Sequence, residues 1–110
     1  ESSAHINFKQ KVIDTLDGDT KLTLKELAPV RLIKNKFYQE VEALYGENPT
    51  IDQLKELLGR ARAKKGMFEG DLDDGELEIG QIAGLIHEIK PAAEIVKEII
   101  SEYESVKKSL

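Results

Sequence analysis

The stretch GDLDDGELEIGQIAGLIHEI, residues 70–89, decides how we interpret the rest of the chain. Its first half is an acidic loop punctuated by glycine, and its second half is a tight apolar turn with helical character. In that turn Gly80 and Gly84 are four residues apart, so on a helix they share one smooth face that another backbone or a flat ligand can approach closely. The spacing alone favours close helix packing. Gly80 also lies at the expected helix start, where free N–H groups can face an anion or a polar ring edge.

The segments that flank this stretch carry helical patterns separated by turn signals. We expect a helix over residues 1–16 capped by Ser2 or Ser3, because a serine hydroxyl can accept a hydrogen bond from a first-turn N–H. Further helices are expected over residues 30–45, from a Thr50–Gln53 capping box to Gly59, and after Pro91 to the end of the chain. In the helix that starts at the capping box, Ile51, Leu54, Leu57 and Leu58 are expected to pack inward.

One short segment has a strand pattern instead. Residues 20–24, TKLTL, alternate with period two and need a partner strand, either residues 30–33 or a part of the protein outside this sequence. A basic patch follows Gly59, and Met67 and Phe68 are expected to anchor a turn. The sequence therefore predicts a mainly α fold of four to five helices with at most a short β-strand or hairpin, in a single domain over residues 1–110.

Composition excludes several classes of function. The 110 residues carry a net charge of −5 and contain no Trp, which argues against a nucleic-acid partner. No apolar run reaches the roughly 18 residues of a membrane span. Cysteine is absent, which excludes disulfides and thiolate chemistry and fits a cytoplasmic protein. Because the chain begins at Glu1, with helix-capping residues directly behind it, we expect a piece of a longer protein.

Two acidic runs, around Gly18 and Gly75, were tested as calcium loops. An EF-hand needs oxygen ligands at its first positions, glycine at the sixth and glutamate at the twelfth. With either glycine in sixth place, the end positions hold Ile13 and Leu24, or Gly70 and Gln81. Both runs are therefore interpreted as solvated turns. His5 and His87 have no partner ligands at helical spacing, so structural or surface roles are predicted, with no catalytic residue and no metal site in this chain.

The start of the second expected helix is basic, with Arg31, Lys34 and Lys36 near its first turn. This order opposes the helix dipole, which favours acidic residues at the start. It is a mild indication that these side chains face something negative, such as a phosphorylated partner. A solvated helix face is the favoured alternative.

Residues 66–91 resemble a known protein family. GQIAGLIHEIKP, residues 80–91, with GMFEGDLDDGELE, residues 66–78, resembles the C-terminal part of the family of FMN-dependent nitronate monooxygenases and type II enoyl-acyl-carrier-protein reductases. PVRLIKNKF, residues 29–37, resembles the Pro-Val-Arg and Lys-Asn segment of that family. ESSAHINFKQKVI, residues 1–13, resembles the segment after its last barrel strand. The matches follow one order across nearly the whole chain.

The resemblance implies a fragment of a TIM-barrel flavoenzyme whose barrel portion, with the phosphate-binding glycines and the catalytic histidine, is absent. It places Gly80 and Gln81 beside FMN and Ile79 near the substrate side. The implied partners are the missing barrel domain of the same protein, an acyl carrier protein, NAD(P)H as electron donor, and further copies in a homo-oligomer. Two departures, LKELAPVR at residues 24–31 and Glu78-Ile79 before the Gly-Gln pair, leave the substrate open.

Two functions are carried forward from the sequence. The first is the substrate-side or lid portion of an FMN-dependent oxidoreductase that resembles enoyl-acyl-carrier-protein reductase II or nitronate monooxygenase, and that is not active alone. The second is a standalone helical protein-interaction module without catalysis.

Overall fold

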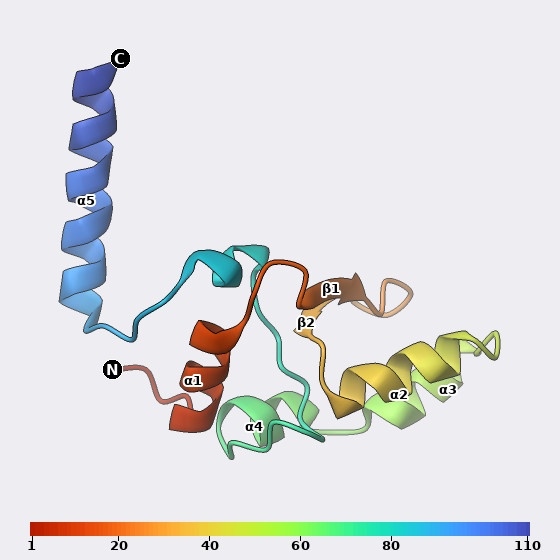
Figure 1. Ribbon diagram of the computed structural model, residues 1–110. Coiled ribbons are helices and arrows are strands. Elements are labelled where there is room, and N and C mark those ends of the chain that lie inside the picture. The colour runs from red at the N-terminus through yellow and green to blue at the C-terminus, as the bar shows by residue number, and fades with distance from the viewer.

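The computed structural model describes residues 1–110 as five α-helices, one short 3-10 helix and one β-hairpin, which confirms the mainly α class (Figure 1). The elements in chain order are α1 (Ile6–Asp14), β1 (Thr20–Thr23), β2 (Val30–Ile33), α2 (Lys36–Tyr45), α3 (Ile51–Leu58), α4 (Arg62–Met67), the 3-10 helix η1 (Gln81–Leu85) and α5 (Ala92–Ser109).

The hairpin lies at the centre of the fold. β1 and β2 pair antiparallel with Thr20 opposite Ile33 and Thr23 opposite Val30, so residues 30–33 are the partner strand for residues 20–24. On its other edge, β2 contacts the extended segment that leads into η1. Ile33 N–H donates to the Leu77 carbonyl over 3.0 Å, and Ile79 N–H donates to the Arg31 carbonyl over 3.0 Å. The segment around residues 77–79 therefore pairs with β2 through one antiparallel bridge, between Leu32 and Glu78.

The central position of β2 divides the core into two clusters. Successive side chains of a strand point to opposite faces, and here Leu32 lies in one cluster while Ile33 lies in the other. The larger cluster contains Leu24, Leu32, Phe37, Tyr38, Val41 and Leu54. The smaller contains Phe8, Ile33 and Leu77, with Ile79 among its half-buried neighbours.

The prediction of a helix from residue 30 is wrong in its first part, because α2 begins only at Lys36. Asn35 has extended backbone and caps the helix by accepting from Tyr38 N–H over 2.9 Å. Residues 30–33 are drawn into the hairpin because Leu32 and Ile33 are needed on opposite sides of it. This local pattern was apolar enough to fit either structure.

The first helix also starts later than predicted, and the serine caps are wrong. α1 begins at Ile6, and its cap is His5, whose Nδ1 accepts from Asn7 N–H over 3.0 Å. His5 N–H donates to the Met67 carbonyl, and a Cβ on Gly70 would lie within 2.4 Å of the imidazole. The expected structural role of His5 is therefore confirmed: it fastens the chain start against residues 67–70.

Two expectations for residues 51–68 need correction. The Thr50–Gln53 capping box is confirmed, and Leu54, Leu57 and Leu58 pack inward as predicted, but Ile51 is 51% exposed. The basic patch after Gly59 forms an additional helix, α4, and Phe68 at its end is 52% exposed rather than anchoring a turn. Positive φ angles at Gly59 and Ala61 separate α3 from α4.

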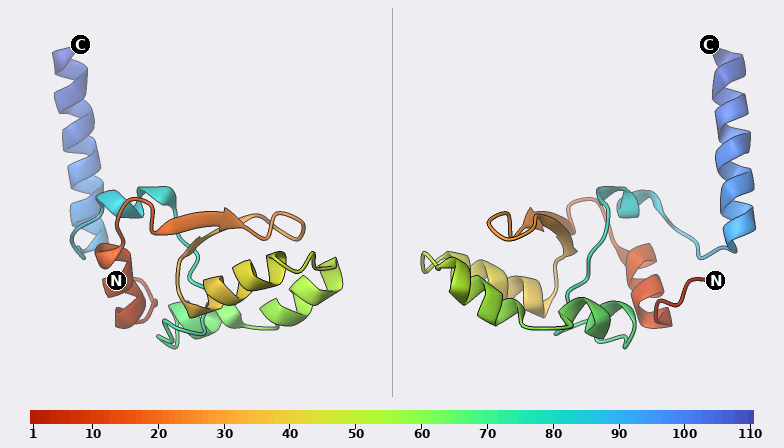
Figure 2. Two further views of the ribbon diagram at one scale, coloured as in Figure 1. Left: turned by 45° about the vertical axis from the view of Figure 1, so that its right-hand side comes forward. Right: turned by 180° about the vertical axis from the view of Figure 1, so that it is seen from behind.

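The last element stands apart from the rest. Figures 1 and 2 show α5 projecting from the body of the molecule, joined to it by the segment after η1. Pro91 precedes its first helical residue, one position before the predicted place, and no residue of α5 is buried. No helix in the structure, α5 included, combines the length and the apolar character needed to cross a membrane.

Candidate functional site

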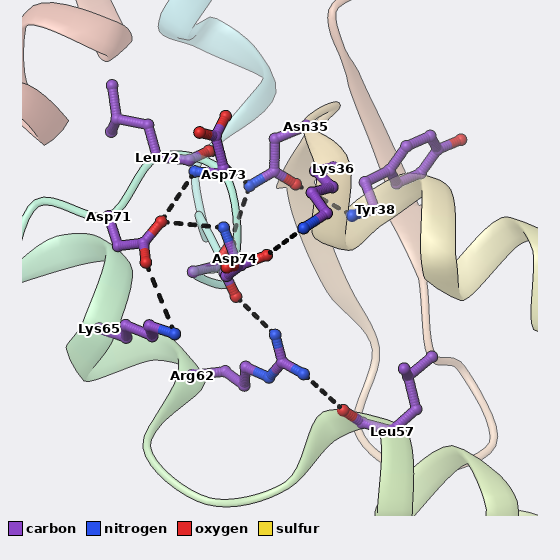
Figure 3. Close-up of polar contacts among 11 residues, drawn as sticks. Asn35, Lys36, Tyr38, Leu57, Arg62, Lys65, Asp71, Leu72, Asp73 and Asp74 are labelled. Carbon is purple, nitrogen blue, oxygen red and sulfur yellow. Dashed lines mark hydrogen bonds and ion pairs between the residues drawn. The ribbon is translucent and has the colours of Figure 1, made fainter.

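The acidic first half of the stretch at residues 70–89 is held in place by hydrogen bonds to its own backbone. The Asp71 carboxylate accepts from the N–H groups of Asp73 and Asp74 over 3.1 and 3.0 Å (Figure 3). These bonds, chiefly the one from Asp74, hold the pKa of Asp71 below its usual value, and Lys65 adds an ion pair at 3.5 Å. The carboxylate at the start of the loop is therefore committed to the turn itself.

Side chains from α2, with its cap Asn35, and from α4 close the same loop, which is more than the solvated turn predicted from the sequence. Asn35 Nδ2 donates to the carbonyls of Leu72 and Gly75, both over 2.9 Å. Arg62 donates to the Asp74 carbonyl over 2.8 Å and lies 4.9 Å above the centre of the Phe37 ring. Lys36 pairs with the Asp74 carboxylate at 3.1 Å (Figure 3). This set of contacts is called the loop brace below.

Two of the three basic side chains at residues 31–36 have partners within the chain. Lys36 is paired inside the chain, and Arg31 donates to the Thr20 hydroxyl over 3.2 Å across the hairpin. Lys34 keeps an exposed side chain, while its N–H donates to the Asp19 carbonyl. Because α2 begins only at Lys36, Arg31 and Lys34 lie before its first turn. Lys34 and Lys36 are both exposed, and Lys36 is the one of the two that is paired, with Asp74.

A close backbone contact between Gly75 and Gly66 fixes the C-terminal end of the loop. A Cβ added to Gly75 would lie 2.4 Å from the Asp71 carbonyl oxygen and 2.4 Å from the Gly66 Cα. Real Cβ atoms do not approach backbone this closely, so both glycines are required where α4 crosses the loop. The following residue, Glu76, donates its N–H to the Arg62 carbonyl over 3.0 Å. The path of the chain toward η1 is thereby set.

Sequence reasoning missed a buried carboxyl on that path. Glu76 is only 6% exposed, and burial, reinforced by the hydrogen bond and charge of Glu78, raises its pKa to about 7. The two glutamates are two apart on extended chain and so share a face, with buried Leu77 opposite. The alternation in ELEI, residues 76–79, is the sequence signal for this extended segment, although the acidic residues around it favour a loop.

The predicted cofactor contact, Gly80 and Gln81, lies directly after this extended segment. Gly80 has extended backbone and its carbonyl accepts from Ala83 N–H over 3.1 Å, which starts η1. A Cβ on Gly80 would meet only Ile82 Cγ2, at 3.9 Å, so the space beside its backbone is open. Gln81 is exposed and lines a surface hollow of about 540 Å³ together with Asp17, Ile82, Gly84 and Leu85.

The shared glycine face expected from the sequence is not formed. Because η1 is a 3-10 helix with three residues per turn, positions four apart are not aligned, and Gly80 caps the helix rather than belonging to it. A Cβ on Gly84 would lie 3.1 Å from Asp17 N, so Gly84 serves close packing against the α1–β1 connection. Gly80 and Gly84 thus have different roles, and only Gly80 borders open space.

Ile79, predicted on the substrate side, is half-buried. It packs against the cluster of Phe8, Ile33 and Leu77, and its N–H is bound to β2. The structure therefore gives Ile79 at least a positioning role: it holds the Gly80–Gln81 turn to the hairpin.

The surroundings of the turn are apolar. Ile82, Leu85 and Leu16 are 62%, 71% and 67% exposed. A flavin ring edge fits such a place in two respects, because Gly80 leaves room for a flat group and the Gln81 amide can both donate and accept hydrogen bonds. The open space at Gly80 and the exposed Gln81 amide therefore suit binding and orientation of a flat polar group.

Comparisons with known proteins bear on the fold and its family. No family model matches the chain, and no curated protein matches it. Among solved structures, FabK from Thermotoga maritima is 32% identical with a TM-score of 0.85, covering 96% of this chain and 33% of that chain. A FabK (M276A) mutant from the same organism is 28% identical with a TM-score of 0.79, covering 98% of this chain and 31% of that chain.

The chain therefore spans about one third of the length of the structures it matches. FabK is an FMN-dependent type II enoyl-acyl-carrier-protein reductase and a TIM-barrel enzyme. The family resemblance indicated by residues 66–91 is thus confirmed: over nearly its whole length this chain is a relative, in sequence and fold, of one part of a type II enoyl-acyl-carrier-protein reductase.

Proposed function

We propose that this chain is the substrate-side portion of an FMN-dependent oxidoreductase that reduces enoyl thioesters, and that it works only together with a barrel of the FabK type. One observation carries the proposal: the whole chain, at a TM-score of 0.85, matches one third of a FabK structure. The nitronate monooxygenase reaction is the second candidate within the same family, and the likeness to FabK favours the first.

Within this proposal the Gly80–Gln81 turn borders the flavin. The open space at Gly80 admits a ring edge, and the Gln81 amide, exposed beside the hollow, orients that ring by a hydrogen bond. Bound FMN supplies the hydride chemistry, and the protein supplies position and polar contacts. Ile79 holds this turn to β2, and the loop brace holds the preceding loop to the start of α2.

Delivery of electrons and substrate involves charged partners in the same proposal. NAD(P)H is the donor, and an acyl carrier protein presents the substrate. Both carry phosphate groups, and Lys34, which is exposed and has no ion pair within the chain, is the cation among residues 31–36 best placed to meet them. Lys36 is less suited, since Asp74 occupies its ammonium group at 3.1 Å.

A chimera tests the proposal. In it, this chain replaces the matching third of Thermotoga maritima FabK, and FMN content and NAD(P)H-dependent reduction of an enoyl thioester are measured. We expect bound FMN and turnover. Gln81→Ala should lower kcat/KM about fivefold to tenfold, the loss of roughly one hydrogen bond.

The matched control is Gln39→Ala, which removes another exposed glutamine amide, on α2, and should leave kcat/KM unchanged. A chimera that folds, as judged by a cooperative thermal transition, but holds no FMN would contradict the proposal. Equal effects of the two glutamine variants would remove Gln81 from the flavin site.

The standalone interaction module keeps one observation in its favour, the exposed apolar face of α5. An FMN titration of the 110-residue chain, followed by circular dichroism, separates the two functions. Cooperative folding without flavin uptake, combined with an inactive chimera, would favour the module.

A further inference from the structure

Helix α5 carries an apolar face that nothing in the chain covers. Its 18 residues make a rod about 27 Å long. Six large apolar side chains recur along it at helical spacing and are 44% to 60% exposed. These six, called the α5 stripe, are Ile95, Val96, Ile99, Ile100, Tyr103 and Val106. At about 100° per residue they occupy one side of the helix, while Ser101 and Ser105 lie on the opposite side.

Only the base of α5 is fastened to the body of the molecule. Ala92 N–H donates to the Glu1 carboxylate over 2.9 Å, and Lys90 pairs with Glu98 at 2.5 Å. Beyond these contacts the helix projects freely (Figures 1 and 2). A soluble chain rarely leaves so long an apolar face open, so the stripe marks an interaction surface.

The α5 stripe continues into a groove on the body. Ile95 belongs to the stripe and also lines a cavity of about 340 Å³ beside α1. Phe8 and Val12 of α1 also line this groove, together with Ile86 and Ile89 from the segment between η1 and α5. Ile95 therefore belongs both to the α5 stripe and to the groove beside α1.

The comparison with FabK indicates what covers this surface. The FabK match includes 96% of the chain, so most of α5 lies inside it, in the same place relative to the body. Contacts within this chain fix only the base of the helix. If the part of FabK outside the match packs against this helix, that packing explains why the helix has the same position in both proteins. A second copy fits less well, because each copy brings a net charge of −5.

We propose that the α5 stripe and the groove beside α1 form the docking surface for the remaining, barrel-containing part of a FabK-like enzyme, which contributes a complementary apolar face. This rests on the proposed function, since it takes the chain to be one third of such an enzyme. It adds which surface joins the two parts, at a distance in sequence from the Gly80–Gln81 turn.

The test compares charge insertions on the two sides of α5 in the FabK chimera. Ile99→Glu and Val96→Glu place a carboxylate in the stripe, whereas Ser101→Glu and Ser105→Glu place the same group opposite. All four positions are exposed in the isolated chain, so its thermal transition should not move for any of them. In the chimera, the stripe variants should lower Tm by about 5 °C or more, the cost of burying an unpaired charge in a protein of that size. The serine variants should not.

The outcomes separate the two proposals. If the chimera binds FMN and all four variants behave alike, the docking surface is overturned and the proposed function stands. If the chimera fails to fold, the isolated chain is mixed with the remaining part of FabK and binding is followed by light scattering. Binding that Ile99→Glu abolishes and Ser101→Glu preserves supports the docking surface, and no binding overturns it. A dimer of the isolated chain that Ile99→Glu dissociates would assign the stripe to a second copy.

Discussion

Residues 1–79 and residues 80–110 contain similar kinds of side chain but use them differently. All buried side chains except Ala83 lie in the first region, where two clusters sit on either side of β2. In the second region Leu85, Ile99 and Tyr103 are each 60% exposed or more. The first region buries its apolar residues because distant segments return to cover them, as the loop brace does when it links α2, α4 and residues 71–75. In the second region the α1–β1 connection packs against Gly84, but no segment of this chain returns to cover α5, and on the proposal above another part of the enzyme does so.

Deleting one large side chain from each region tests the difference between the two regions most directly. Phe37 is fully buried and lies beneath the Arg62 guanidinium. Phe37→Ala should destabilise the chain by about 3–5 kcal/mol, since it leaves a cavity and an unsupported cation. Ile99→Ala in the isolated chain should change stability by less than about 0.5 kcal/mol. Urea unfolding of both variants measures the difference, and similar midpoints would show that α5 is packed in solution.

A second pair of variants removes polar contacts to the loop at residues 70–75. Asn35→Ala removes the α2 cap and leaves the carbonyls of Leu72 and Gly75 without their donor. We expect a loss of about 2–3 kcal/mol, because these groups are partly buried. Asn7→Ala removes one exposed bond to the Gly70 carbonyl and should cost less than about 1 kcal/mol. Thermal denaturation of the two variants side by side is the measurement, and a smaller effect at Asn35 would contradict the bracing role.

What the sequence could predict follows the same division. The Thr50–Gln53 capping box, the turn at Gly59 and the helix after Pro91 depend on neighbours in sequence, and all three are confirmed. The start of α2 at Lys36 depends on Asn35, whose side chain binds the carbonyls of Leu72 and Gly75, far away in sequence. The prediction from neighbouring residues therefore places that start too early. The close packing at Gly84 was indicated by spacing, although the partner backbone at Asp17 was not.

Exposure was the least predictable property. Ile51 and the α5 stripe have the periodicity of buried residues, but periodicity says only that a face is apolar and not that a partner is present. Glu76 is the opposite case, a charged residue type whose burial comes from its place between Arg62 and the β2 edge. For the candidate site, Gly80 and Gln81 were named from a resemblance, and the structure adds that they border open space. Their contact with FMN stays a prediction.

The smallest expected effect concerns Glu76 and depends on pH. Its pKa of about 7 in the folded chain lies above its usual value of 4.5, so the folded state keeps a proton that the unfolded chain has already released. Stability should therefore fall as pH rises from about 4.5 to 7 and then level off. Glu76→Gln removes that slope, and at pH 8 it should be more stable than the parent by about 1–2 kcal/mol. Because burial is the main cause and Glu78 the second, Glu78→Gln should reduce the slope without abolishing it. Urea unfolding at pH 5 and pH 8 distinguishes the three chains, and a parent that is more stable at pH 8 would show that Glu76 is ionised in the fold.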